Sequence, residues 1–435
     1  MFFCKETVTD GISLSVIESD KFKAGVITFS LSLPLSKPVV AHNLILSGML
    51  RRGTISYPTM ADINRRLDEL YGSYVEVKSV HLGNDLSLVL TAEVLDNKYI
   101  PDGTDALGGV IDLIAEILLS PAFLQSASGE RLLDQERRIV SDNLRAEINN
   151  TRVYAVRRCS ELMRGENSPY PTVSELKDLV ANATLEEIKA AREELITTSP
   201  LEVFYIGATP TEEIKEKILS AFSGHKFAID LRANTVTPLS RECFAESSEK
   251  MPVSQSKLTM GFSTRACISK DNNDCYAALM LNEIFGGSAS SKLFLNVREK
   301  MSLCYYCSSS FSIYTGVITV ASGIEADKLA IVKRAILDQL CEIQNGNISD
   351  AELTAARKSI LHGYRQLYDS PFDLQSFYSA RMAFGINDSI EECTAKLMKV
   401  SREDVIDIAK RISLDALFFI EGTSGAKADE EDENE

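Results

Sequence analysis

The sequence has no run of apolar residues long enough to cross a membrane and no long cluster of Lys and Arg. Its most apolar segment, 106–124, is interrupted by Asp112, Glu116 and Pro121, so we expect it to form a buried helix. The 435 residues carry a formal net charge of −16. An acidic chain without a basic cluster argues against nucleic acid or an anionic membrane as its main partner.

The sequence also lacks the features of a signal peptide and of a disulfide framework. Lys5, Glu6 and Asp10 stand where a signal peptide would continue its apolar region. Nine cysteines, an odd number without framework spacing, fit reduced thiols, and we expect the protein to be cytoplasmic. Cys304 and Cys307 form a single CxxC sequence. Because a zinc site needs two further ligands at suitable spacing, we interpret both cysteines as packing residues.

A capped helix followed by an apolar strand occurs twice, half the chain apart. Thr184 and Glu187 form a capping box at the start of a helix that leads to the strand 201–207. Ser401 begins a similar helix, which leads to the strand 416–422. Self-similarity at this period predicts an α+β fold of two related halves, each a mostly antiparallel sheet with helices packed on one face.

The other expected elements repeat the same order in both halves. Strands are expected near 11–17, 25–31, 74–77, 86–90, 257–262, 303–311 and 315–322, and helices near 38–50, 59–72, 105–119, 128–164, 208–222, 272–284, 290–299 and 325–398. We therefore divide the chain into a first half (1–222), an extended linker (223–256), a second half (257–425) and an acidic, disordered tail (426–435).

A Gly/Ser-rich segment, 286–291, precedes a short helix and then a strand. Leu293, Phe294 and Val297, at i, i+1 and i+4, are spaced to share one buried helix face. Arg298 lies near the end of this helix, and Tyr305 follows seven residues later. A permanent planar cation and a phenol donor together suit a peptide carbonyl or a developing oxyanion. Taken alone, a surface Arg and a core Tyr are the commoner interpretation.

Two α+β halves joined by a linker resemble the pitrilysin/insulinase metallopeptidase family in its form with two halves per chain, like the subunits of the mitochondrial processing peptidase. Active members carry His-x-x-Glu-His on a helix of the first half, followed by a segment like Met-Leu-x-x-Gly-Thr. The segment 49–54 matches the latter and sets the register. Leu44 and Gly48 then stand where the two histidines would be, and Ser47 stands in place of the Glu that acts as general base.

The resemblance also locates the third zinc ligand, a Glu that follows another Glu by seven residues. Glu136 matches the earlier position, and Asn143 occupies the ligand position. A register that starts at His42 puts Ile45 and Leu46 where Glu and His are needed. The remaining histidines, at positions 81, 225 and 362, show no paired ligand spacing. The resemblance thus implies that this chain holds no metal or other cofactor.

The second half matches the family where the first half does not. Active members have an Arg with a Tyr seven residues on, a pair that binds the substrate carbonyl, and Arg298 and Tyr305 match it. In two-subunit bacterial members, one chain carries zinc and its partner carries this pair. The chain is similar to the second kind, the zinc-less YmfF-like group.

The resemblance implies a non-catalytic, substrate-binding subunit of a heterodimeric zinc-dependent peptide-processing peptidase. The chain would be inactive alone, its partner would be a zinc-bearing homologue, and Arg298 and Tyr305 would complete the partner's active site on a peptide substrate. The alternative is a purely structural scaffold subunit, like the respiratory-complex core proteins of this family. A self-sufficient peptidase with an unfamiliar metal site has no support in the sequence.

Overall fold

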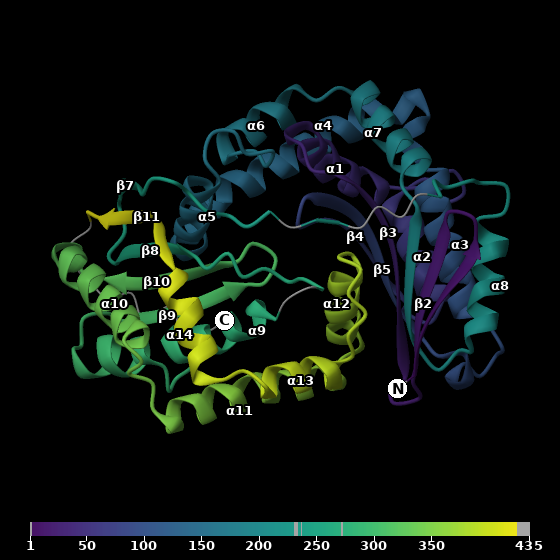
Figure 1. The fold of residues 1–435 in the computed structure, drawn as a ribbon. Coiled ribbons are helices and arrows are strands. Elements are labelled where there is room, and N and C mark those ends of the chain that lie inside the picture. The colour runs from purple at the N-terminus through teal and green to yellow at the C-terminus, as the bar shows by residue number, and fades with distance from the viewer. Residues whose placement is uncertain (1, 230–233, 236, 271–272, 424–435) are drawn as a thin grey trace. The chain divides into compact units, whose positions relative to one another are not determined.

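The described part of the chain forms two compact units, each built around one β-sheet (Figure 1). The computed structural model describes residues 2–229, 234–235, 237–270 and 273–423. The expected acidic tail, 426–435, lies outside these residues. Unit 1 comprises Met1–Arg145, Pro169–Thr235 and Leu367–Ala383, and unit 2 comprises Ala146–Ser168, Val236–Gln366 and Phe384–Glu435.

The sheet of unit 1 has six strands in the order β1-β2-β6-β3-β5-β4. All neighbours are antiparallel except β2 and β6. The fully buried side chains of this unit include Phe29 and Phe123. The strands are β1 (Phe2–Thr9), β2 (Ile12–Glu18), β3 (Ala24–Pro34), β4 (Tyr74–Leu82), β5 (Asp85–Leu95) and β6 (Leu201–Gly207).

The helices of unit 1 begin at side-chain caps that the local sequence supplies. Ser36 accepts from the backbone N–H of Val39 at the start of α1, and Thr59, Thr172 and Thr184 each form a capping box. The helices are α1 (Lys37–Leu50), α2 (Met60–Glu69), α3 (Ala106–Leu119), α4 (Ser126–Ala146), α6 (Val173–Asn182), α7 (Leu185–Thr198), α8 (Thr211–Ala221) and α12 (Pro371–Met382), with 3₁₀ turns η1 (Asn97–Tyr99), η2 (Ala122–Leu124) and η7 (Leu367–Asp369).

The sheet of unit 2 has five strands in the order β7-β11-β8-β10-β9. Only β7 and β11 are parallel. The strand after the capped helix, β11, lies between a parallel and an antiparallel neighbour, as β6 does in unit 1. The strands are β7 (Ala245–Met251), β8 (Ser256–Ser263), β9 (Tyr306–Ser312), β10 (Val317–Ile324) and β11 (Ser413–Gly422).

Unit 2 also contains eight described helical segments and two 3₁₀ turns. Two of the segments, η4 and η5, are π-helical and flank the Gly/Ser-rich loop. The segments are α5 (Thr151–Arg164), α9 (Asp274–Asn282), η4 (Glu283–Gly287), η5 (Leu293–Lys300), α10 (Leu329–Gln344), α11 (Asp350–Gln366), α13 (Ile390–Met398) and α14 (Arg402–Arg411), and the 3₁₀ turns are η3 (Glu147–Asn149) and η6 (Ala326–Lys328). Within the described residues, no helix combines the length and apolarity needed to span a bilayer.

Each unit takes one helix from the other half of the sequence. In unit 1, α12 packs on β3 and β6, and the rings of Phe204 and Tyr378 stack with centroids 6.4 Å apart. In unit 2, α5 packs on β8 and β11, where Ala416 and Phe418 share a small buried cluster with Cys159. The halves 1–222 and 257–425 are defined by the repeat in the sequence, whereas the two compact units are defined by spatial contacts. The two divisions therefore have different boundaries.

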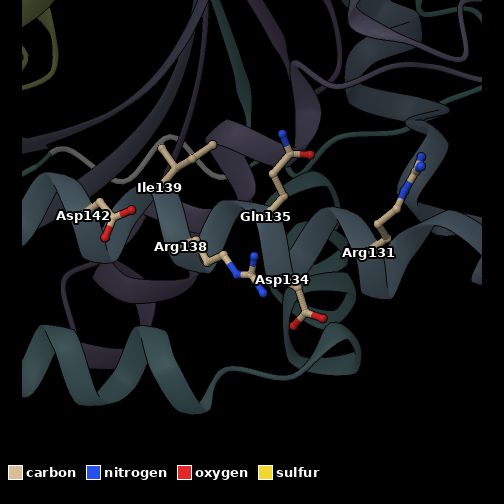
Figure 2. Close-up of a pocket in the computed structure, with 6 residues that line it drawn as sticks. All are labelled: Arg131, Asp134, Gln135, Arg138, Ile139 and Asp142. Carbon is tan, nitrogen blue, oxygen red and sulfur yellow. The ribbon is translucent and has the colours of Figure 1, made fainter.

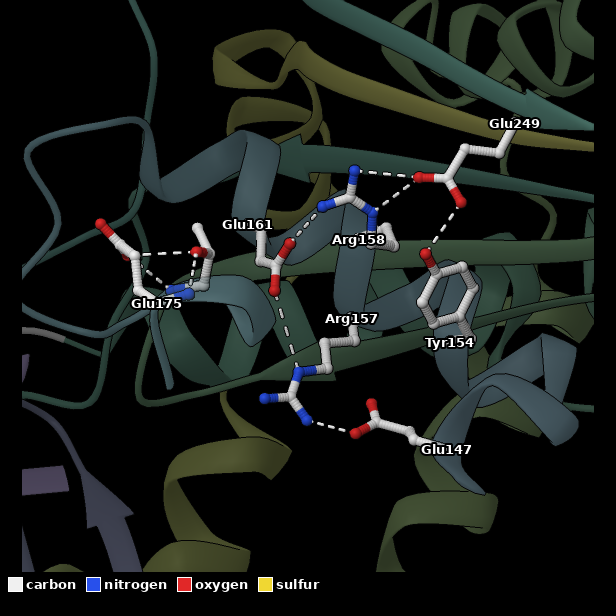
Figure 3. A network of polar contacts seen from close by, with 8 residues as sticks. Glu147, Tyr154, Arg157, Arg158, Glu161, Glu175 and Glu249 are labelled. Carbon is white, nitrogen blue, oxygen red and sulfur yellow. Dashed lines mark hydrogen bonds and ion pairs between the residues drawn. The ribbon is translucent and has the colours of Figure 1, made fainter. Parts of the chain in front are cut away.

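Ion pairs and hydrogen bonds join α5 to β7 at the edge of the second sheet (Figure 3). The Tyr154 hydroxyl donates to Glu249 at 2.8 Å. Arg158 donates to Glu249 at 3.0 Å and to Glu161 at 2.6 Å. Burial and the Glu249 carboxylate raise the pKa of Tyr154 to about 12, so this phenol stays a neutral donor.

The predicted fold class is confirmed, with differences in detail. Both sheets are mostly antiparallel, and the two halves share one strand order around β6 and β11. The strands β1 and β7 and the helix α6 were not predicted, although Thr172 and Glu175 form the capping box that marks the start of α6. The segment 223–256, expected to be an irregular linker, includes β7. The helix expected over 128–164 is interrupted at η3.

Removing either repeated cap should cost about 1 kcal/mol of unfolding free energy. Thr184 accepts from the N–H of Glu187, and Ser401 accepts from that of Asp404, so Thr184→Ala and Ser401→Ala each leave a helix N–H without its side-chain acceptor. Urea denaturation measures the change. Glu194→Ala, on an exposed position of α7, is the control and should stay within about 0.5 kcal/mol. Cap variants as stable as the control would contradict this account.

Candidate functional site

The helix α1 carries the positions that correspond to the zinc motif. Leu44 is half-buried and packs against the core of unit 1. Ser47 is buried, and its hydroxyl donates to the carbonyl oxygen of Leu44 at 2.9 Å. A hydroxyl bonded to its own helix backbone is not poised to take a proton from water. Neither side chain is therefore suited to hold zinc or to act as a general base.

Gly48 provides space for the carboxylate of Glu136. A Cβ atom placed on Gly48 would collide with the Glu136 carboxylate group. Glu136 is only 3% exposed and forms an ion pair with the guanidinium of Arg52, which follows α1. A cation from the same chain thus balances a buried carboxylate at the position where the family resemblance puts the second zinc histidine.

The other residues considered for metal binding do not complete a site. Asn143 is exposed on α4. His42 is half-buried, and burial lowers its pKa, against the opposing effect of Glu187 and Glu194. Across the described ranges, no three or more His, Cys, Asp and Glu side chains gather into a set that could hold a metal ion. The residues at the zinc positions therefore do not fit zinc, because Leu and Gly offer no ligand atom.

A surface hollow of about 670 Å³ lies along α4, close in sequence to these positions (Figure 2). Its lining alternates positive and negative side chains and includes neither Glu136 nor Asn143, so the hollow does not coincide with the zinc positions. The lining residues are Arg131, Asp134, Gln135, Arg138, Ile139 and Asp142.

In unit 2, packing and polar contacts hold the segment that carries Arg298. Lys292 forms an ion pair with Glu352 at 2.7 Å, and the Asn296 amide donates to Gln339 at 2.6 Å. Leu293 and Val297 are fully buried, as predicted, whereas Phe294 is only half-buried. The segment η5 is π-helical and not α-helical. π-Helical turns are rare in proteins, and those that occur often lie at functional sites.

Arg298 and Tyr305 both present donors at the surface of unit 2. The guanidinium of Arg298 lies 4.8 Å from the ring centroid of Phe294 and 3.7 Å from Glu299, and its side chain is 40% exposed. Tyr305 is 60% exposed, so the alternative of a core Tyr is wrong. Its backbone N–H donates to the carbonyl oxygen of Gly323 at 2.9 Å. Within the described residues, its hydroxyl has no hydrogen-bond partner.

A second cluster at β9 was missed by sequence reasoning. The guanidinium of Arg152 lies 4.5 Å from the ring centroid of Tyr306 and donates to Ser308 at 3.3 Å, and the Lys257 ammonium is 5.6 Å from the same ring. Burial raises the pKa of Tyr306 to about 12. Arg152 lies in the first half of the sequence and Tyr306 in the second half, so no local sequence pattern reveals their contact.

Comparisons with known proteins find related sequences along the chain. Residues 182–360, which include the Gly/Ser-rich loop, Arg298 and Tyr305, match the family model described as "Peptidase M16 inactive domain". A Bacillus subtilis protein named "Probable inactive metalloprotease YmfF" is 28% identical over 422 residues, covering 96% of this chain and 97% of its own. The chain is thus similar to the M16 inactive-domain family over residues 182–360 and to a probable inactive metalloprotease over nearly its whole length.

Solved structures share the fold over nearly the whole chain. A conserved protein from Enterococcus faecalis has a TM-score of 0.86 at 24% identity, covering 98% of this chain and 100% of its own. A peptidase M16 inactive domain from Pseudomonas fluorescens has a TM-score of 0.76 at 16% identity, with the same coverage. These likenesses confirm the two-half α+β fold.

Proteins named as zinc proteases are similar to the chain over a shorter region. An uncharacterized zinc protease from Rickettsia bellii is 27% identical over 161 residues, which is 36% of this chain and 38% of its own. The chain is thus similar both to proteins described as inactive M16 peptidases and to zinc proteases. The resemblance drawn from the sequence is confirmed at this level.

Proposed function

We propose that the chain is the substrate-binding, non-catalytic subunit of a heterodimeric M16 peptidase. One contrast carries the proposal. The zinc positions hold Leu44, Ser47 and Gly48, with Glu136 paired to Arg52, whereas Arg298 and Tyr305 keep exposed donors. A purely structural scaffold has no use for that pair.

The role of this chain in the reaction would be electrostatic. A zinc-bearing homologous partner would supply the metal and the attacking water. Arg298 and Tyr305 would donate hydrogen bonds to the substrate carbonyl oxygen as negative charge develops on it. Donors fixed in place before the reaction are worth several kcal/mol in other enzymes, about 2.7–4 kcal/mol for one oxyanion donor.

The position of Tyr305 supports a peptide as the substrate. Tyr305 leads directly into β9, which is an edge strand of its sheet. An extended peptide can add to such an edge through main-chain hydrogen bonds. A backbone held along β9 would pass close to Tyr305. The free cysteines support a cytoplasmic location for the complex.

Co-purification from the native cell tests the proposal. Tagged chain should come out in one-to-one ratio with a zinc-bearing M16 homologue, with one zinc per pair and none in this chain alone. An obligate pair of this kind commonly buries more than about 1,200 Å² and should survive gel filtration. Tagged chain that emerges repeatedly alone, or holds its own zinc, would contradict the proposal.

A further inference from the structure

Arg152 is an exposed cation in the first turn of α5, beside β9 of unit 2. Arg157 and Arg158, on the same helix, form ion pairs with glutamates (Figure 3). Ala155 and Val156, three and four residues beyond Arg152 on the helix, supply no carboxylate to it. Within the described part of the chain, Arg152 forms no ion pair at all. Its charge is therefore available to a carboxylate that another molecule brings.

Two uncharged contacts position the guanidinium of Arg152. It lies over the ring of Tyr306, 4.5 Å from the centroid, and donates to the hydroxyl of Ser308 at 3.3 Å. Burial raises the pKa of Tyr306 to about 12, against the opposing effect of the Arg152 charge, so the ring stays neutral. A guanidinium has several N–H donors around its edge, and Ser308 accepts from one of them. Arg152 is thus held in place by contacts that leave other donors for a ligand.

Lys257 brings a second positive charge to the same ring. Its ammonium lies 5.6 Å from the centroid of Tyr306, and it donates to the side-chain oxygen of Gln255. Two cations that share one ring repel each other, and a carboxylate bound by Arg152 would relieve this repulsion. The cluster of Arg152, Tyr306 and Lys257 is therefore suited to an acidic ligand.

The register of β9 places this cluster where a peptide could reach it. Ser309 points to the helix-covered face of the sheet, since it is 9% exposed and donates to Asn282 of α9 at 2.8 Å. Because side chains alternate along a strand, Tyr306 and Ser308 share the opposite face with Arg152. A peptide added to the edge strand β9 would direct every second side chain to that face. A side chain opposite Ser308 would lie next to the guanidinium of Arg152.

We propose that Arg152 binds a carboxylate of the peptide substrate, so that the complex selects peptides with a Glu or Asp side chain near the scissile bond. A guanidinium edge can donate two parallel hydrogen bonds to one carboxylate. Tyr305, which directly precedes Tyr306, would contact the scissile carbonyl, so the acidic side chain would lie within a few residues of that bond. The role in cleavage rests on the proposed function. The binding of acidic peptides does not, and it is tested without any peptidase assay.

Peptide selection by the immobilised full chain tests this binding. From a pool of random peptides with blocked ends, the wild type should enrich Glu over Gln about tenfold at one position. Arg152→Gln should lose this enrichment, and Arg152→Glu should enrich Lys and Arg in its place. Arg334→Gln, which removes an exposed Arg from α10 of the same unit, is the matched control and should behave like the wild type. Equal enrichment of Glu and Gln by the wild type, or an enrichment that Arg152→Gln keeps, would overturn the proposal.

Cleavage by the assembled complex distinguishes a failure of this inference from a failure of the proposed function. A peptide that the wild-type complex cleaves is remade with Glu, Gln or Lys at each position that flanks the scissile bond. At one position Glu should exceed Gln about tenfold in kcat/KM, mainly through KM, because Arg152 holds the bound substrate before the reaction. Arg152→Gln should abolish this preference, and Arg152→Glu should favour Lys.

Arg298→Ala should instead slow the cleavage of every peptide and keep the preference for Glu. A complex whose activity depends on Arg298 but which treats Glu and Gln alike at every position would overturn the role of Arg152 and leave the proposed function intact. A complex that is insensitive to Arg298→Ala would contradict the proposed function, and peptide selection by the chain alone would still decide whether Arg152 binds a carboxylate.

Discussion

Arg298→Ala and Tyr305→Phe should each lower turnover by the peptidase complex about 10²–10³-fold, while folding and pairing stay nearly intact. Each change removes one donor that would stabilise the developing oxyanion. Arg298 is 40% exposed at the end of η5, where truncation typically costs less than about 1 kcal/mol of stability. The measurement is steady-state cleavage of a peptide by the complex assembled with each variant.

The kinetic constants separate two ways of losing this activity. The loss appears mainly in kcat if the contact forms only in the transition state, and KM also rises if Arg298 holds the ground-state carbonyl. Lys300→Ala removes an exposed charge from the same π-helical segment and is the matched control. Ser47→Ala, at the former base position, should also change almost nothing. Equal activity of Arg298→Ala and wild-type complexes would make the chain a scaffold.

Arg52→Met should destabilise the chain by about 3 kcal/mol, because it leaves the Glu136 carboxylate buried without its cation. The Glu136 side chain is 4% exposed and that of Arg52 is 22% exposed. Glu136→Gln should cost less, since Arg52 can turn toward water. The double variant with Met at both positions should recover most of the loss, because an apolar pair of similar volume often replaces a buried ion pair at little cost.

Urea denaturation of the wild type, Arg52→Met, Glu136→Gln and the double variant measures the change in unfolding free energy for each. Arg51→Met provides the matched control, because Arg51 is the exposed neighbour of Arg52 and should stay within about 0.5 kcal/mol of the wild type. An Arg52→Met chain as stable as the control would mean that the ion pair does not hold this part of unit 1. The account of how the zinc positions are filled would then be wrong.

The repeated architecture could be predicted from the sequence because its signals are local. Capping boxes at Thr184 and Ser401, each followed by an apolar strand, depend on a few neighbouring residues. The exchange of α5 and α12 between the compact units could not be predicted. An apolar helix face indicates that the helix is buried, but it does not indicate which sheet covers it.

The candidate site shows the same division between local and tertiary information. The positions of Leu44, Ser47 and Gly48 on α1 follow from the helix and the family register. The contact of Gly48 with Glu136, and the pairing of Glu136 with Arg52, join residues more than 80 positions apart in the sequence.

A mixing experiment tests the central claim most directly. Purified chain is titrated into a purified zinc-bearing M16 homologue from the same cell, and peptide cleavage is followed. The proposed function predicts that neither protein cleaves alone and that activity rises to a plateau at a one-to-one ratio. It also predicts that Arg298→Ala chain forms the same complex with little activity. Full cleavage by the zinc-bearing homologue alone, unchanged by added chain, would contradict the account.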